Sequence, residues 1–175
     1  MAAYDYATER ERYLPRAGVK VLFVGESAPD PNAKQIRFFY HPVLRSADNL
    51  FRGIMLALYG AGKQSLASTP KTHWLERFQG DGYYLEDLCA LPVNRLPARQ
   101  RSQARRTAVP NLLRRIEALS PRGIVVCHGG TYMDIADCLR ANRLPVLHCE
   151  PIPFPLGSYR ARFARDAQAA LSRLR

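Results

Sequence analysis

A short proline-rich stretch near the C-terminus carries the residues best suited to recognition chemistry. Its three prolines stand at alternate positions and remove three backbone N–H donors, which predicts a rigid extended loop rather than a strand interior. An apolar wedge on a stiff loop, beside a hydroxyl, an aromatic ring and a guanidinium, suits insertion into a nucleic-acid groove. The alternative interpretation is a plain connector that Ser158 joins to a helix by capping it. The prolines are Pro151, Pro153 and Pro155, the wedge is Leu156, and the polar groups are Ser158, Tyr159 and Arg160.

Cysteine and histidine pairs raise the question of a metal site. The four cysteines lack the C-x-x-C spacing of zinc fingers and thioredoxin-like motifs, which favours buried thiols in a reducing compartment. Cys127-His128 and His148-Cys149 each end a predicted strand, so one residue of each pair could face a common site if the strands are neighbours. Tetrahedral zinc needs three or four convergent ligands. We therefore expect no metal and no cofactor.

The charge of the chain is unevenly distributed. Lysine and arginine number 26 against 15 acidic residues, a formal net charge of +11. Up to Pro92 the chain has 11 basic and 10 acidic residues, whereas from Val93 onward it has 15 basic and 5 acidic, and all 15 are arginine. Arginine binds phosphate in a bidentate manner and stacks on bases, which points to DNA as a partner. The alternative is a solvated arginine-rich surface.

Length and composition indicate a folded protein. At 175 residues with 47% hydrophobic residues, the chain can bury a sizeable apolar core. We expect one domain over residues 1–175, in which residues 1–18 form an N-terminal helical extension. No apolar run approaches the ~18 residues that span a bilayer, and the acidic N-terminal stretch is unlike a signal peptide. The expectation is a cytoplasmic monomer without membrane contact.

Hydrophobic periodicity predicts alternating strands and helices. Short apolar runs predict strands over 20–25, 83–88, 123–127 and 144–149. Helical spacing predicts helices over 50–58, from about 101 to 119, over 132–139 and over 158–174. Pro110 predicts either a kink or a helix that starts near Ala108, and segment 62–82 looks like an irregular surface excursion. Strands separated by helices predict an α/β fold, a three-layer α/β/α arrangement with a central four-stranded parallel sheet.

Several chemically capable side chains follow the predicted strands. In an open parallel sheet the site lies at the carboxyl ends of the strands. Glu26 follows the first strand, Asp87 belongs to the end of the second, His128 follows the third, and the proline-rich loop follows the fourth. An aromatic cluster, Phe38-Phe39-Tyr40, also follows the first strand. These groups are expected to surround one cleft.

The ordered set of motifs resembles the uracil-DNA glycosylase superfamily. Gly25-Glu26-Ser27-Ala28-Pro29 is similar to its motif I in the Gly-Glu-Ala-Pro-Gly form, and Phe38-Phe39-Tyr40 stands where the family places the aromatic that stacks on a flipped base. Ile152 to Gly157, followed by Tyr159 to Phe163, resembles motif II, His-Pro-Ser-Pro-Leu-Ser with Tyr-Arg-Gly-Phe after it. Pro92 to Arg95 and Pro121 to Val126 resemble the central segment. The similarity runs from about Val19 to the C-terminus.

The chain also departs from this family. The motif II histidine, which stabilises the departing base in many members, falls on Ile152, and the motif I aspartate of the classical branch falls on Ser27. The base-reading asparagine falls on Asp87, to within about one residue. The Gly-Glu-Ala-Pro-Gly branch carries an iron–sulfur cluster, but this chain lacks the paired N-terminal cysteines. We expect no iron–sulfur cluster.

The resemblance implies a DNA-repair hydrolase that flips a base out of DNA and cleaves its N-glycosidic bond. A carboxylate beside the sugar would stabilise oxocarbenium character and orient a water, with Glu26 the first candidate and Asp87 the second. Phe39 would stack on the base and Leu156 would fill the vacated space. The residues expected at the base are Gly25, Ser27, Phe39 and Tyr40. Those expected on DNA are Pro153, Pro155, Leu156, Gly157, Ser158, Tyr159 and Arg160.

Other interpretations remain open at this stage. Glu26 could pair with an arginine, Asp87 could cap a turn, and Phe39 and Leu156 could be core residues. At the level of function, the first alternative is a catalytically inactive nucleic-acid-binding protein of the same fold. The second is a metal-dependent hydrolase that uses Cys127, His128, His148 and Cys149.

Overall fold

A parallel β-sheet lies at the centre of the protein. The computed structural model describes residues 4–30, 32–33 and 35–174. Within them the sheet has the strand order β2-β1-β3, with β1 at Val21–Ser27, β2 at Tyr83–Cys89 and β3 at Gly123–Val126. β1 is parallel to both neighbours, and its register pairs Gly25 with Asp87. The apolar runs therefore form buried strands, as the sequence predicts.

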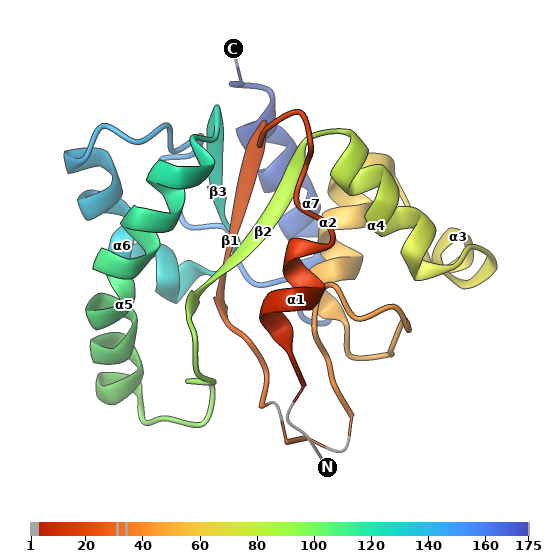
Figure 1. The fold of residues 1–175 in the computed structure, drawn as a ribbon, viewed down its shortest axis with the longest axis horizontal. Helices are drawn as coiled ribbons and strands as arrows, with labels where there is room; N and C mark the ends of the chain where they lie inside the picture. The colour runs from red at the N-terminus through yellow and green to blue at the C-terminus, as the bar shows by residue number, and fades with distance from the viewer. Residues whose placement is uncertain (1–3, 31, 34, 175) are drawn as a thin grey trace.

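Helices flank both faces of this sheet (Figure 1). On one face α5 (Ala98–Leu119) packs against α6 (Gly129–Ala141). On the other, α2 (Asn49–Tyr59) packs against α7 (Tyr159–Leu171), and α4 (Lys71–Gly80) lies against β2. The short helices α1 (Tyr6–Glu11) and α3 (Lys63–Ser68) complete the described elements. The described helices include none with the length and apolar character of a membrane span.

The fourth strand expected over Leu144–Cys149 is reduced to a single parallel bridge between Val146 and Ile124. Backbone bonds from Ile124 N to Pro145 O (2.8 Å) and from Leu147 N to Ile124 O (2.9 Å) form that bridge. The N–H of Val126 then donates to His148 Nε2 at 2.9 Å instead of to a backbone carbonyl. An imidazole thus takes the place of the next ladder bond, which ends the pairing after one residue.

Two expectations about helices are corrected. Segment 62–82 contains α3 and α4 instead of an irregular excursion, because Trp74, Leu75 and Phe78 form a buried stripe on α4. α5 continues through Pro110, so no helix starts near Ala108. Pro110 is exposed, whereas Val109 and Leu112 are buried, so packing of the apolar stripe holds the helix together across the proline.

The N-terminal extension is helical over Tyr6–Glu11 and is attached to the rest of the protein. Asp5 caps α1 by accepting from the N–H groups of Ala7 and Thr8, both at 3.1 Å. Gln79 of α4 donates to the carbonyls of Arg12 and Leu14, both at 3.0 Å. Residues 1–3 of the expected extension lie outside the described residues. Arg10 of α1 donates to Asp87 Oδ2 at 3.1 Å, which places the helix beside the carboxyl end of β2.

A glycine in α2 allows the proline-rich loop to pack directly against the helix. A Cβ at Gly53 would lie 2.6 Å from Pro155 Cβ and 3.0 Å from Phe163 Cδ1, so the helix backbone and the loop are in direct contact. Pro155 and Ile152 are buried accordingly. Glycine costs a helix interior about 1 kcal/mol relative to alanine, and this close approach explains why it stands here.

We predict that Gly53→Ala lowers the free energy of unfolding by about 1–3 kcal/mol, because overpacking outweighs the gain in helix propensity. Urea unfolding measures the effect. Gly80→Ala is the matched control, since Gly80 is also helical and nothing lies within 4 Å of its added Cβ. Equal stability of the two variants would contradict the packing role of Gly53.

Candidate functional site

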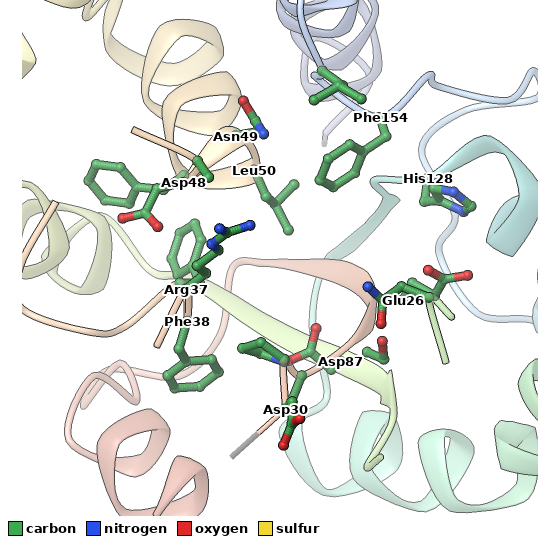
Figure 2. Close-up of a pocket in the computed structure, with 18 of the residues that line it drawn as sticks. Glu26, Asp30, Arg37, Phe38, Asp48, Asn49, Leu50, Asp87, His128 and Phe154 are labelled. Carbon is green, nitrogen blue, oxygen red and sulfur yellow. The ribbon is translucent and has the colours of Figure 1, made fainter. Parts of the chain in front are cut away.

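A cleft of about 1100 Å³ opens at the carboxyl ends of β1 and β2. In Figure 2, His128 and Phe154 lie on one side of it, Arg37 and Phe38 on the other, and Asp87 between them. Ligands of open parallel sheets bind at the carboxyl ends of the strands, and this cleft lies at that position. Its lining comprises Glu26, Ser27, Ala28, Pro29, Asp30, Ala33, Gln35, Arg37, Phe38, Phe39, Ala47, Asp48, Asn49, Leu50, Phe51, Leu85, Asp87, Asn94, Arg95, Arg101, His128, Pro153, Phe154, Leu156 and Tyr159.

The proline-rich loop forms one rim of the cleft. Leu156 is 59% exposed and lines the cleft together with Pro153, Phe154 and Tyr159. Gly157 and Ser158 are exposed beside it, and Ser158 makes no side-chain capping bond to α7. Arg160 instead ties the loop to α2, because its Nη2 donates to Asn49 Oδ1 at 3.0 Å. The loop is therefore anchored at its base and presents an apolar tip.

Glu26 is held by two arginines of α5. Arg101 binds both carboxylate oxygens, with Nε 2.6 Å from Oε1, and Arg105 Nη1 lies 2.7 Å from the same oxygen. Arg105 also donates from Nε to Asp134 of α6 at 2.6 Å. Burial alone would raise the pKa of Glu26, but the hydrogen bonds from Arg101 and Arg105 hold it below the usual value. Glu26 is thus a carboxylate that accepts three hydrogen bonds from two guanidiniums.

The pKa of Asp87 is shifted in the opposite direction from that of Glu26. It is 7% exposed, and its Oδ2 accepts from Arg10 of α1 at 3.1 Å. Burial raises the pKa of Asp87 to about 6, and the adjacent Glu86 adds to the rise, while Arg10 and Arg115 oppose it. Oδ1 makes no hydrogen bond among the described residues. Asp87 is therefore the carboxyl group on the cleft wall that can exchange a proton near neutral pH.

Gly25 makes room for this carboxyl group. A Cβ at Gly25 would lie 2.6 Å from Asp87 Oδ1. Gly25 sits within β1 opposite Asp87 and is not among the residues that line the cleft, so the structure does not bring this expected site residue to the cleft. Ser27 does line the cleft, and its Oγ accepts from Val93 N at 3.3 Å.

The aromatic cluster after β1 is mostly core. Phe39 is 6% exposed and touches the cleft with one edge, since its ring packs against Phe51 and Phe78 at centroid distances of 5.5 and 5.2 Å. Tyr40 is fully buried, and its hydroxyl accepts from Leu85 N at 2.7 Å. The structure therefore brings Phe39 to the cleft but not Tyr40. Phe154, which is half-buried, offers a further ring to the cleft.

A buried ion pair supports the same wall. Lys71 Nζ of α4 lies 3.0 Å from Asp48 Oδ2 and 3.2 Å from Phe38 O. Burial lowers the pKa of Lys71 to about 8 despite the carboxylate. Asp48 stands at the N-cap of α2, but its side chain caps no helix N–H. The pair joins α2 and α4 to the segment that carries Phe38.

The cysteine and histidine pairs do not converge. Cys127 is buried and donates to Val125 O, while Cys149 is exposed. Both ring nitrogens of His148 are used, by Val126 N and by Glu150 O at 2.8 Å. Over residues 4–30, 32–33 and 35–174 there is no group of three or more histidine, cysteine or acidic side chains that could hold a metal ion. The hypothesis of a metal-dependent hydrolase that uses Cys127, His128, His148 and Cys149 is therefore wrong.

Some residues of the cleft were not predicted from the sequence to belong to the site. Arg101 and Arg105 stand four residues apart on one helix face, a spacing that signals a shared partner. Arg10 and its partner Asp87 are 77 positions apart, and no local pattern indicates that contact. Phe154 belongs to the proline-rich loop, but no sequence pattern indicates that its ring lines the cleft.

A scan against known protein families finds no match, and a search of the curated proteins finds none either.

We predict that Asp87→Asn stabilises the protein at neutral pH. Because the folded-state pKa of about 6 lies above the ordinary aspartate pKa of 3.8, the folded state binds more protons between these values, and stability falls as pH rises through that window. Urea unfolding at pH 4 and pH 7.5 should show the variant gaining about 1–3 kcal/mol over wild type at the higher pH. Asp137→Asn, at a fully exposed position, is the control. A pH-independent difference would contradict the prediction.

Proposed function

We propose that this protein binds DNA, flips out a deaminated or damaged base and hydrolyses its N-glycosidic bond, as a glycosylase with a uracil-DNA-glycosylase-like fold. The observation that carries the proposal is a single cleft that combines an exposed apolar wedge at its rim, Leu156, with a proton-accepting carboxyl group inside, Asp87. The ordered motifs of the sequence support the same function. The cleft volume of about 1100 Å³ is ample for one nucleotide.

The charge of the cleft suits a nucleic-acid backbone. Among its acidic side chains, Glu26, Asp48 and Asp87 are neutralised by ion pairs within the protein. Arg37 and Arg95 are exposed on the cleft and make no ion pair with any described residue. Two guanidiniums are thus available for phosphates, and phosphate contacts position a protein on DNA.

The loop tip suits base flipping. A leucine in the duplex can occupy the space that an extruded nucleotide leaves, and a wedge works only if its backbone does not yield. The loop backbone is restrained by prolines, by the contact between Pro155 and Gly53, and by the bond from Arg160 to Asn49. Tyr159, which is 53% exposed, lies beside the wedge.

Asp87 is the better candidate for the general base. A water would add its oxygen to C1′ while Asp87 accepts the water proton, and the C1′–N bond would break with its electron pair on the base. This role favours the carboxyl group with fewer donors around it: Glu26 accepts three hydrogen bonds from two guanidiniums, whereas Oδ1 of Asp87 accepts none from the described residues. Glu26 would act indirectly, by orienting Arg101 on the cleft wall.

A catalytically inactive DNA-binding protein is the second candidate. One observation favours it: the two guanidiniums on Glu26 occupy the carboxylate that the motif I resemblance places nearest to the chemistry. The two candidates share the cleft and the wedge, so they differ only in bond cleavage.

The decisive experiment is strand scission. Enzyme in excess is incubated with duplexes carrying uracil, hypoxanthine or xanthine, and alkali then cleaves abasic sites. We expect scission whose rate rises with pH through about 6 as the Asp87 carboxylate forms. Asp87→Asn should lower the rate roughly 10²–10⁴-fold. Leu156→Ala should lower it roughly 10-fold or more on duplex DNA but little on single strands, where there is no vacated space to fill. If none of the three duplexes is cut, the catalytic proposal is lost.

Salt dependence tests the DNA-binding half of the proposal. Affinity for a 20-base-pair duplex should fall steeply with salt, and Arg37→Gln and Arg95→Gln should each reduce the slope of log K against log salt by about 0.9. Arg16→Gln, in the loop before β1 at the opposite edge of the sheet, serves as the control. Binding that salt does not weaken would exclude both candidates, whereas salt-dependent binding without scission would leave the second.

A further inference from the structure

His148 connects β3 to the start of the proline-rich loop through both nitrogens of its ring. Its Nε2 accepts from the N–H of Val126, the last residue of β3, at 2.9 Å. Its Nδ1 lies 2.8 Å from the carbonyl oxygen of Glu150, which directly precedes Pro151. Because a backbone N–H can only donate and a carbonyl oxygen can only accept, the ring is neutral and carries its proton on Nδ1.

This side chain holds the N-terminal end of the loop. Backbone pairing with β3 stops at the bridge between Val146 and Ile124, and the bond to Val126 N continues the connection past that point. The C-terminal end of the loop has a separate anchor, the bond from Arg160 to Asn49 of α2. The loop is therefore held at one end by an imidazole, whose hydrogen bonding changes when the ring is protonated.

A second proton on the ring would abolish the connection to β3. Protonated imidazole donates from both nitrogens, so Nε2–H would face the N–H of Val126, another donor. The residue is only 6% exposed, and its ring stacks on Tyr132 at a centroid distance of 4.7 Å. Water can solvate the new charge only if segment 148–150 moves away from β3.

The groups around the ring do not compensate a positive charge. Two of them are guanidiniums: Arg140 donates to His148 O at 3.2 Å, and Arg173 donates to Leu147 O at 3.4 Å. Burial lowers the pKa of His148, and the two guanidiniums lower it further, whereas the bond to Glu150 O opposes the shift. The titratable and charged groups on the surrounding elements are Tyr132 and Arg140 of α6, Arg173 beyond α7, the buried Cys127 after β3, and the exposed Cys149 and Glu150 on the same segment.

We propose that His148 is an acid-sensitive latch: protonation at Nε2 detaches segment 148–150 from β3 and frees the start of the proline-rich loop, while the sheet stays folded. The direction follows from the lowered pKa of the folded state. The latch is fully closed above pH 6.5, the ordinary histidine pKa, and opens as pH falls through the lower folded-state value. Leu156 then loses its fixed position at the rim of the cleft. The latch acts on the loop itself, whatever the loop binds.

An NMR titration from pH 7.5 to 4.5 tests this proposal without a ligand. It is done in the Asp87→Asn background, because the Asp87 carboxyl group, with a pKa of about 6, would titrate in the same range. Long-range proton–nitrogen spectra should show the His148 ring protonated on Nδ1 at neutral pH. The backbone amides of Val126, Leu156 and Gly157 should then shift with the ring at one midpoint below pH 6.5, whereas the amides of β1 and β2 should not.

Three variants assign the titration to His148. His148→Gln places an amide oxygen near the position of Nε2, so it accepts from Val126 N without titrating, and the loop amides should lose their response. His128→Asn is the matched control: it removes the imidazole that packs on Phe154 at 6.2 Å but keeps an N-cap acceptor for α6, and the response should remain. Arg140→Gln retains His148 and removes one facing cation, so the midpoints of ring and loop should move together to higher pH.

Four results would overturn the inference. They are a ring protonated on Nε2 at neutral pH, loop amides that do not follow the ring, a loop response that persists in His148→Gln, and a loop midpoint in Arg140→Gln that departs from the ring midpoint. A shift of the β1 and β2 amides at the same midpoint would also overturn it, because the transition would then be global unfolding rather than release of the loop.

Discussion

Three carboxylates with little solvent exposure, Glu26, Glu86 and Asp87, lie at the carboxyl edge of β1 and β2, and the rest of the site depends on how each is neutralised. An unpaired buried charge costs several kcal/mol, so each carboxylate needs a cation or a proton. Arg101 and Arg105 of α5 neutralise Glu26, Arg115 of the same helix binds Glu86, and Arg10 of α1 reaches Asp87. The long α5 and the N-terminal α1 are therefore part of the site: each carries guanidiniums to the edge of the sheet.

This neutralisation gives Glu26 and Asp87, two of the carboxyl groups that line the cleft, different pKa values. Glu26 receives two guanidiniums and stays ionised, whereas Asp87 shares Arg10 with Glu86 and has a raised pKa. Environments that push two carboxyl pKa values apart are how one fold supplies both a permanent anion and a proton acceptor. The order of the two candidates is thereby reversed from the sequence analysis, in which Glu26 came first. Motif position identified both residues, but only the long-range contacts distinguish their states.

The parts of the fold that were predictable are those with strong local patterns. The runs at β1, β2 and β3 and the stripe of α2 are apolar enough to specify buried elements, and parallel pairing then places Glu26, Asp87 and His128 at one edge. α4 was missed because its stripe is brief and lies among polar residues. The expected fourth strand fails at His148, whose side chain displaces a backbone bond, and periodicity carries no sign of that. The burial of Phe39 was equally unpredictable from local sequence, because its ring packs against Phe51 and Phe78, which are distant in the sequence.

The cleft divides its two proposed tasks between separate strand ends. The proline-rich loop supplies shape: Ile152 and Pro155 are buried as anchors, and Leu156 projects. It contributes no imidazole, because the position at which the resembling family carries one is the core residue Ile152. An imidazole reaches the cleft from elsewhere: His128, the N-cap of α6, lines the cleft, and its Nδ1 accepts from Thr131 N. An anchor must be apolar to dock on α2, and a donor must be accessible to a ligand, so one side chain at position 152 cannot satisfy both demands in this packing. In this structure the loop is anchored at positions 152 and 155 by apolar contacts.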